Sequence, residues 1–457
     1  MRGAPLTPPP VAASAHGVKR FGAAFGARFF LLLALGLLWL VPTAFHTQFA
    51  YGMFAWDLLV VLAWAVDFRR LPRPGRIEAS RLWGAPASLA NPVEIVLEVR
   101  NRSGRALRLA LTDDVPATLC AEAPVRELAV AGGGMARAAY RARPMRRGDL
   151  ALGELYIRYG SPLRLAERWA AAGLAQEVRV YPDLARARDP LGMIRNRLAD
   201  VQRRQSRSRG RGREFESLRE YQDGDEFRNI CWRASARRGK LITRQFQLER
   251  SQPVWLVVDA GRLMRAKIDG LSKLDYATGA ALSLAEVALA SGDRVGLMSY
   301  GRSVRSRILP GRGGAHLRAI LEHLATAAEE AAESNPLQAA SVLLATQSRR
   351  SLVVWVTDFA ETALTPDVID AARLLMPRHV VVLLVIGQPD LAELASRNPS
   401  SVPEMYLAAA AQETMHRREV LLAALRQRGA LAAEVDHAGA AAAAVNSYLE
   451  VKGRSLV

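Results

Sequence analysis

The chain has few cysteines, and their positions favour neither a cross-link nor a metal site. Cys120 and Cys231 are the only two in 457 residues, and neither has a partner at metal-ligand spacing. A disulfide framework is therefore excluded. Both residues are expected to be buried, reduced thiols in a reducing compartment.

Lysine is also scarce, although the chain is strongly basic. It has five lysines and 57 arginines against 44 acidic residues, which gives a formal net charge of +18. On a chain rich in alanine, this balance indicates compositional bias more than a nucleic-acid footprint. Hydrophobic residues make up 50% and charged residues 23% of the chain, so wholesale disorder and a coiled coil are excluded. The length predicts two or three domains.

Charge is nearly absent from residues 29–66, where Asp57 is the one charged residue. The run divides into residues 29–45 and 49–66, each close to the roughly 17 residues that a membrane span requires. We therefore expect a transmembrane hairpin over residues 29–68, in the bacterial inner membrane. A cleaved signal peptide is the alternative, which a second span following at once disfavours.

Positive residues flank both ends of this hairpin. Arg28 precedes it, and Arg69 and Arg70 follow it. The positive-inside rule then places both termini of a multi-pass protein in the cytoplasm. Residues 1–28 are expected to be a disordered cytoplasmic tail. Asp57 is either a functional acid within the membrane or a residue close to the interface.

A strand pattern dominates residues 69–182. In residues 91–100, apolar side chains alternate with charged ones, which predicts a strand with one buried face. Glycine and proline turns separate such segments, and only residues 165–174 favour a short helix. The segment is predicted to be a small β-sandwich-like domain. It has no histidine, cysteine or acidic cluster that suggests chemistry, so it is interpreted as a spacer or binding module.

Residues 183–252 are expected to be an arginine-rich linker followed by a dense charged and aromatic segment. Residues 203–213 hold six arginines and no acid, a pattern that suits RNA, DNA, anionic lipid, an acidic protein surface or a solvated loop. Residues 214–250 are nearly balanced in charge, and we expect mutual ion pairs to fix them. This stretch has no histidine, and Ser217, Ser235 and Cys231 lack an obvious activator, which argues against catalysis there.

Strands and helices alternate in residues 253–457, which predicts a doubly wound α/β domain. An apolar strand ends at Asp259, and residues 351–357 repeat this form before Asp358. Because ligands bind at the carboxyl ends of parallel strands, both acids fall where a site is expected.

This domain resembles a von Willebrand factor A domain. With the upstream segment, the membrane hairpin and the β-rich domain, nearly the whole chain resembles the bacterial domain-of-unknown-function family 58, whose members are often encoded beside MoxR-type AAA+ ATPases. The segment's most specific residues are Arg219, Glu220, Tyr221, Gly224, Asp225, Arg228, Trp232, Ser235 and Arg237.

The resemblance to A domains implies a Mg²⁺ site, which this sequence matches only in part. Asp259 matches the first aspartate and Asp358 the third-loop aspartate, but Gly261 and Leu263 stand at the two serine positions. The second loop, near residues 334–336, offers no threonine. Two carboxylates alone hold Mg²⁺ weakly, so the expectation is a degenerate site or acids that cap strand ends and pair with arginines.

The leading hypothesis is a non-enzymatic, inner-membrane-anchored interaction or scaffold protein. It is based on the membrane hairpin, the absence of a nucleophile–base arrangement, and a fold pattern that is intact while its metal motif is incomplete. The implied partner is a MoxR-type AAA+ ATPase, with a role in assembling or maturing protein complexes; membrane lipid is a second expected contact. A metal-dependent or acid-assisted hydrolase at the sheet edge is one alternative. Nucleic-acid binding by residues 203–213 is the other. The seven histidines are scattered without ligand spacing, and no catalytic residue is assigned.

Overall fold

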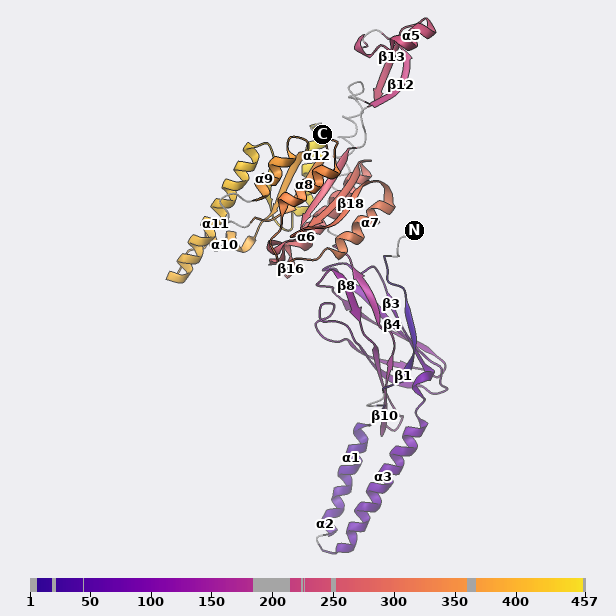
Figure 1. Cartoon of the computed structure of the whole chain (residues 1–457). Coiled ribbons are helices and arrows are strands. Elements are labelled where there is room, and N and C mark those ends of the chain that lie inside the picture. The colour runs from indigo at the N-terminus through magenta and orange to yellow at the C-terminus, as the bar shows by residue number, and fades with distance from the viewer. Residues whose placement is uncertain are drawn as a thin grey trace. The chain divides into compact units, whose positions relative to one another are not determined.

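A computed structural model describes residues 6–18, 22–43, 45–183, 214–222, 225, 227–247, 252–359 and 367–454. The chain divides into two compact units, Arg2–Tyr181 and Pro182–Val457 (Figure 1). The first unit contains the apolar helices and the β-rich domain. The second contains the α/β domain and the upstream segment.

Two antiparallel apolar helical arms, joined by a short turn, form one end of the first unit (Figure 1). The first arm is α1 (Ala27–Gly36), η1 (Leu37–Trp39) and α2 (Leu40–Thr43); the second is η2 (Thr47–Phe49) and α3 (Ala50–Arg70). By length and composition, Thr47–Arg76 can cross a membrane, with a mean hydropathy of 1.8, whereas Ala27–Thr43 is apolar but shorter. Membrane association is thereby supported by one candidate helix.

Glycines bring the two arms close together. The indole Nε1 of Trp56 donates a hydrogen bond to the Leu32 carbonyl at 2.9 Å. A Cβ on Gly36 would lie 2.8 Å from both the Asp57 carboxylate and the Trp56 ring, so a larger residue there would require these side chains to shift. Small residues at helix contacts are typical of membrane helices. Asp57 therefore faces α1 and not the open surface of the helix.

The expectation of a disordered tail over residues 1–28 is wrong for two segments. β1 (Val11–Gly17) and β2 (Ala23–Phe25) are strands of the β-rich domain. The first half of β1 pairs with β3 (Ile77–Trp83), and its last residues pair with β10 (Ala166–Ala172). Strand pairing far along the chain orders this segment, which has no strong local signal.

The β-rich domain has two sheets that share β1. The strand order is β6-β5-β9-β10-β1-β3-β4-β7, with β2 on β10 and a separate β8–β11 pair. Its remaining elements are η3 (Pro74–Arg76), β4 (Val93–Asn101), β5 (Leu107–Asp113), β6 (Val125–Val130), β7 (Met135–Ala142), β8 (Gly148–Leu152), β9 (Leu155–Gly160) and β11 (Gln176–Val180). Alternate residues of β4 and β5 are buried, as the period-two pattern predicts. The short helix favoured over residues 165–174 is not formed, because β10 occupies them.

The α/β domain contains a six-stranded sheet of order β18-β17-β14-β19-β20-β21. β18 is antiparallel to β17, and the other neighbours are parallel. The strands are β14 (Pro253–Asp259), β17 (Arg294–Tyr300), β18 (Val304–Gly311), β19 (Leu352–Thr357), β20 (Val380–Ile386) and β21 (Leu431–Val435). β14 and β19 form where the apolar runs before Asp259 and Asp358 predict them.

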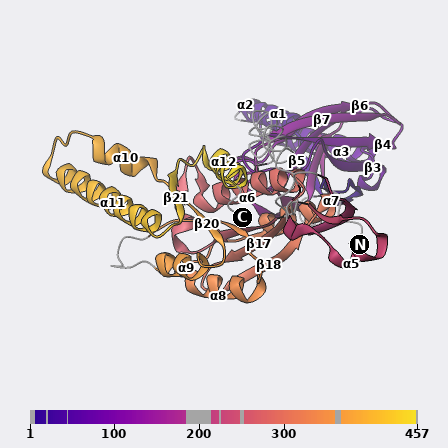
Figure 2. The ribbon, with the colours of Figure 1, turned by 90° about the horizontal axis from the view of Figure 1, so that it is seen from above.

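Helices cover both faces of this sheet (Figure 2). On one face, Trp255 and Trp355 pack in a core with α8, α9 and α11; on the other, α6 and α12 contact each other and the sheet. The elements are η5 (Arg262–Arg265), β15 (Lys267–Ile268), β16 (Leu271–Ser272), α6 (Lys273–Ala290), α7 (Gly313–Thr326), α8 (Pro336–Thr346), α9 (Asp367–Leu375), α10 (Pro389–Ser396), α11 (Val402–Gln427) and α12 (Ala440–Gly453). The mixed α/β architecture predicted for this region is confirmed.

The segment before the α/β domain is a small hairpin, which we call the signature hairpin. It consists of β12 (Glu214–Glu220), η4 (Phe227–Asn229), α5 (Trp232–Arg238) and β13 (Ile242–Gln247). β12 and β13 pair antiparallel. Gly239 adopts a left-handed conformation with φ of 67° and ends α5. Glycine is the residue that most often ends helices in this way, because it has no Cβ to clash.

Candidate functional site

The two predicted acids lie at the carboxyl ends of adjacent strands, β14 and β19. Asp259 is 3% exposed. Its Oδ2 accepts hydrogen bonds from Tyr300 at 3.1 Å, Ser334 at 3.0 Å and Thr357 at 2.7 Å. Its Oδ1 accepts one from the Gly261 backbone at 2.8 Å. Burial raises the pKa of Asp259, and these four donors oppose that rise.

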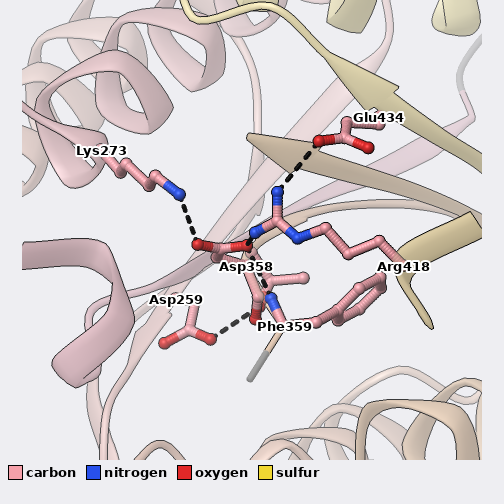
Figure 3. Close-up of polar contacts among 7 residues, drawn as sticks. Asp259, Lys273, Asp358, Phe359, Arg418 and Glu434 are labelled. Carbon is pink, nitrogen blue, oxygen red and sulfur yellow. Dashed lines mark hydrogen bonds and ion pairs between the residues drawn. The ribbon is translucent and has the colours of Figure 1, made fainter. Parts of the chain in front are cut away.

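Asp358 is held by two cations (Figure 3). Lys273 Nζ lies 2.6 Å from its Oδ2, and the Arg418 guanidinium pairs with its Oδ1. The Phe359 backbone also donates to Oδ1, at 2.8 Å. Arg418 also forms an ion pair with Glu434, with its Nη1 2.9 Å from Glu434 Oε1. Both carboxylate oxygens of Asp358 therefore already have charged partners, in line with the expectation that this acid pairs with an arginine.

Lys273 is one of the site residues that the sequence did not reveal. It is the first residue of α6 and is fully buried. Ser272 and Asp275 form a capping box at this helix start, which fixes the backbone from which the lysine extends. The available signal was its rarity, since the chain has five lysines among 62 basic residues. Thr357 and Tyr300, which bond Asp259, were also missed.

The donor set does not fit the Mg²⁺ site that the resemblance implies. Gly261 and Leu263 bring no side-chain oxygen, and Asp358 is already in contact with the Arg418 guanidinium and the Lys273 ammonium group. Mg²⁺ requires near-octahedral oxygen ligation. Over the described ranges, no group of three or more histidine, cysteine or acidic residues is placed to hold a metal ion. We therefore derive no chemistry through a metal.

A buried serine–histidine pair lies apart from these acids. Ser351 Oγ and His379 Nδ1 are 2.9 Å apart, just before β19 and β20 begin. The acids instead follow the carboxyl ends of their strands. Burial lowers the pKa of His379, and both side chains are almost fully buried. The pair has the residue types of a nucleophile and base but no exposure to a substrate, so it is structural.

The signature hairpin is fixed by weaker contacts than the sequence suggested. Arg219 pairs with Asp225 at 2.7 Å, and Lys240 pairs with Glu220 at 3.1 Å. Ser235 Oγ accepts a hydrogen bond from the Ile242 backbone at 2.8 Å. These ion pairs are partly or largely exposed, so each contributes about 0–1 kcal/mol. Breaking either pair is therefore expected to cost far less than breaking a buried ion pair.

The other predicted signature residues differ in how exposed their side chains are. Tyr221 is half-buried and donates to the Asp225 carbonyl at 3.3 Å, while Arg228, Trp232 and Arg237 are exposed. Gly224 and residues 203–213 lie outside the described residues. Among the hairpin side chains that the structure describes, four apolar ones are at least 40% exposed: Leu218, Phe227, Trp232 and Leu241. Such exposure of aromatic residues suits a binding surface better than a core.

Neither cysteine is fully buried, contrary to the expectation, and the two differ in reactivity. Hydrogen bonds from the Ala234 backbone and the Arg244 side chain lower the pKa of Cys231, whereas burial raises the pKa of Cys120.

Because the thiolate is the reactive form, iodoacetamide is expected to alkylate Cys231 at lower pH than Cys120. Peptide mass spectrometry across a pH series measures both rates. Arg244→Gln should slow Cys231 alone, and faster labelling of Cys120 would contradict the assignment.

Comparisons with known proteins support the family resemblance. Residues 217–419 match the model of a family described as "Protein of unknown function DUF58". A 178-residue segment is 30% identical to uncharacterized protein YeaD of Bacillus subtilis, covering 39% of this chain and 41% of that protein. A 187-residue segment is 27% identical to uncharacterized protein Rv1480 of Mycobacterium tuberculosis, covering 40% and 58%. The chain thus spans about half the length of these relatives.

Solved structures give weaker similarity. The conserved hypothetical protein BatB from Bacteroides thetaiotaomicron superposes with a TM-score of 0.32 and 14% identity, over 45% of this chain and all of that one. An aerotolerance-related membrane protein from Bacteroides fragilis gives 0.32 and 16%, over 44% and 99%.

The apolar N-terminal helix, the β-rich domain and the α/β domain define a membrane-associated protein of mixed architecture. Within it, residues 217–419 match the model of the DUF58 family, whose function is unknown. This confirms the resemblance drawn from the signature residues.

Proposed function

We propose that this chain is a membrane-anchored interaction protein whose signature hairpin binds a protein partner, a MoxR-type AAA+ ATPase. In this proposal it acts as a scaffold in the assembly or maturation of protein complexes and carries out no catalysis. The observation that carries the proposal is the exposure of aromatic side chains on the family's own segment.

Strand pairing supports an anchor in the form of a hairpin. β1 precedes the helical arms and β3 follows them, and the two strands are hydrogen-bonded neighbours, with Val11 opposite Arg81. If both arms enter the bilayer, the chain must return to the side from which it started. Arg69 and Arg70, at the end of α3, favour the cytoplasm as that side. We therefore propose an inner-membrane protein with both termini in the cytoplasm.

The signature hairpin has the composition of an interaction surface. Phe227 is 74% exposed and Trp232 is 67% exposed. Tryptophan and arginine are enriched among the residues that dominate binding energy. On α5 the tryptophan is followed by three exposed arginines, at positions 233, 237 and 238. Charge complementarity therefore favours a partner surface with an apolar pocket rimmed by acidic groups.

The von Willebrand A-type fold is part of the proposal. A mostly parallel sheet with helices on both faces, an antiparallel edge strand and acids after β14 and β19 are consistent with it. The hydrolase alternative gains no support from this edge, because Asp259 already accepts hydrogen bonds from neutral donors and Asp358 already pairs with cations. The nucleic-acid alternative depends on residues 203–213, which lie outside the described residues.

Co-purification tests the proposal. Tagged full-length chain is extracted from membranes in mild detergent, with and without ATP, and recovered AAA+ ATPase is quantified. Trp232→Ser combined with Phe227→Ser is expected to weaken binding by about 2 kcal/mol or more, which is about 30-fold in affinity. Tyr406→Ser is the matched control, since Tyr406 is 70% exposed on α11.

Each result of this experiment bears on a different part of the proposal. Loss of the ATPase from the hairpin variant, with retention by the Tyr406 variant, supports the proposal. Retention by the hairpin variant removes this surface as the binding site. Recovery of no AAA+ ATPase by wild-type chain under either nucleotide condition removes the partner assignment.

A further inference from the structure

We infer that the carboxyl edge of the α/β sheet is a fixed-charge centre in which the Lys273 ammonium group takes the place of a divalent metal ion. This inference goes beyond the proposed function and does not depend on it. It follows from four features of the described residues.

The first feature is the charge that the edge must neutralise. Asp259 and Asp358 are 3% and 6% exposed, and they follow neighbouring strands of one sheet. Buried carboxylates need cations or several hydrogen-bond donors. Asp259 is satisfied by neutral donors, whereas Asp358 is satisfied by Lys273 and Arg418. A divalent ion at this acid would face two positive groups already in contact with it.

The second feature is that the ammonium group is part of the fold. Lys273 is fully buried, and its Nζ lies 2.6 Å from Asp358. Its backbone N–H donates to the Ala266 carbonyl at 2.9 Å, and the capping box fixes the residues on either side. The backbone of Lys273 is thus fixed, and its ammonium group could admit another cation only by giving up its buried contact with Asp358.

The third feature is the packing around Gly261, at the position where an A domain has a serine. A Cβ on Gly261 would lie 2.7 Å from the Ser334 Cβ and 2.9 Å from the Ser334 backbone nitrogen. The space of a ligating hydroxyl is thus filled by the second loop. That loop uses Ser334 to donate to Asp259 at 3.0 Å. The loop geometry therefore favours hydrogen bonding over metal ligation.

The fourth feature is the continuation of charge beyond Asp358. Arg418 joins Asp358 to Glu434, so carboxylates and cations alternate in the order Lys273, Asp358, Arg418, Glu434 (Figure 3). This network of ion pairs connects α6, the end of β19, α11 and β21. The network already contains two acids and two bases, so its charges balance without a metal ion.

Metal titration tests the inference on detergent-solubilised full-length protein. Mn²⁺ is the probe, with binding followed by electron paramagnetic resonance and stability by the melting temperature. Wild-type chain is expected to bind no stoichiometric Mn²⁺ and to melt at the same temperature with EDTA or with millimolar Mn²⁺. Saturable binding that Asp358→Asn abolishes would overturn the inference.

Substitution of the lysine supplies the second arm. Lys273→Met is expected to lower the melting temperature by several degrees, because Asp358 then keeps only one of its two cations. Lys273→Met with Asp358→Asn is expected to lower it less, because neither charge of this buried pair remains and Arg418 still pairs with Glu434. Lys267→Met, at an exposed lysine on β15, is the control and should change nothing. If the single variant does not fold, recovery of folded protein in the double variant gives the same answer. Strictly additive effects, or a double variant worse than the single, would overturn the inference.

Discussion

Replacing Arg81 with methionine is expected to destabilise the β-rich domain by about 3–5 kcal/mol, since it leaves a buried aspartate without its cation. Arg81 and Asp113 are both fully buried and form an ion pair between β3 and β5. Arg81 also donates to the carbonyls of Leu174, at 2.8 Å, and Gly153, at 3.1 Å. One side chain thereby joins four segments of the domain. Hydrogen–deuterium exchange of β3 and β5 measures the loss as faster local opening.

Arg137→Met is the matched control for this experiment. Arg137 pairs with Glu98 at 2.8 Å between neighbouring strands of the same domain, but its side chain is 62% exposed. Exposed pairs are worth about 0–1 kcal/mol, so exchange should change little. Equal effects of the two substitutions would show that burial of the Arg81 pair does not set its contribution.

Arg81 also shows why part of this structure escaped prediction. Its strand has an alternating pattern in which Ile77, Ala79 and Arg81 face inward. An inward-facing arginine on such a strand indicates a buried partner, but among 57 arginines the one at an inward position is easily overlooked. Its partner lies 32 residues away, and nothing local to Asp113 identifies it.

The α/β domain was predictable where the signal was local. Continuous apolar runs marked β14 and β19, and their ends marked Asp259 and Asp358 at the sheet edge. The cations that hold Asp358 were not predictable, because Lys273 is 85 residues away from it and Arg418 is 60. Side-chain pairs over such separations depend on the packing of helices on the sheet, which a single sequence does not encode in any short pattern.

Local propensity misled in the β-rich domain. Residues 166–172 hold four alanines, which favour a helix, yet they form β10 between β9 and β1. Strand β1 was missed for the opposite reason, since Val11–Gly17 has little apolar alternation of its own. In both segments, hydrogen bonding to neighbouring strands outweighs the preference of the residues themselves.

The last helix, α12, depends on a buried cluster that substitution should disrupt. Lys452 Nζ lies 2.6 Å from Asp293 Oδ2 and 2.9 Å from the Tyr448 hydroxyl, which itself donates to Asp293. Lys452→Met is expected to cost about 3–5 kcal/mol, because Asp293 is fully buried and loses its charge partner. The loss should appear as faster exchange in α12 and in α6, against which α12 packs.

Two variants make this expectation specific. Arg454→Met breaks an exposed pair with Glu450 on the same helix, so α12 should keep nearly wild-type exchange. Lys452→Met combined with Asp293→Asn removes both charges and should restore part of the protection, because no buried ion is then left unpaired. If Arg454→Met opened α12 as much as Lys452→Met, the helix would be held by its exposed face. If the double variant were the worst of the three, the ion pair would not be the reason that Lys452 is required.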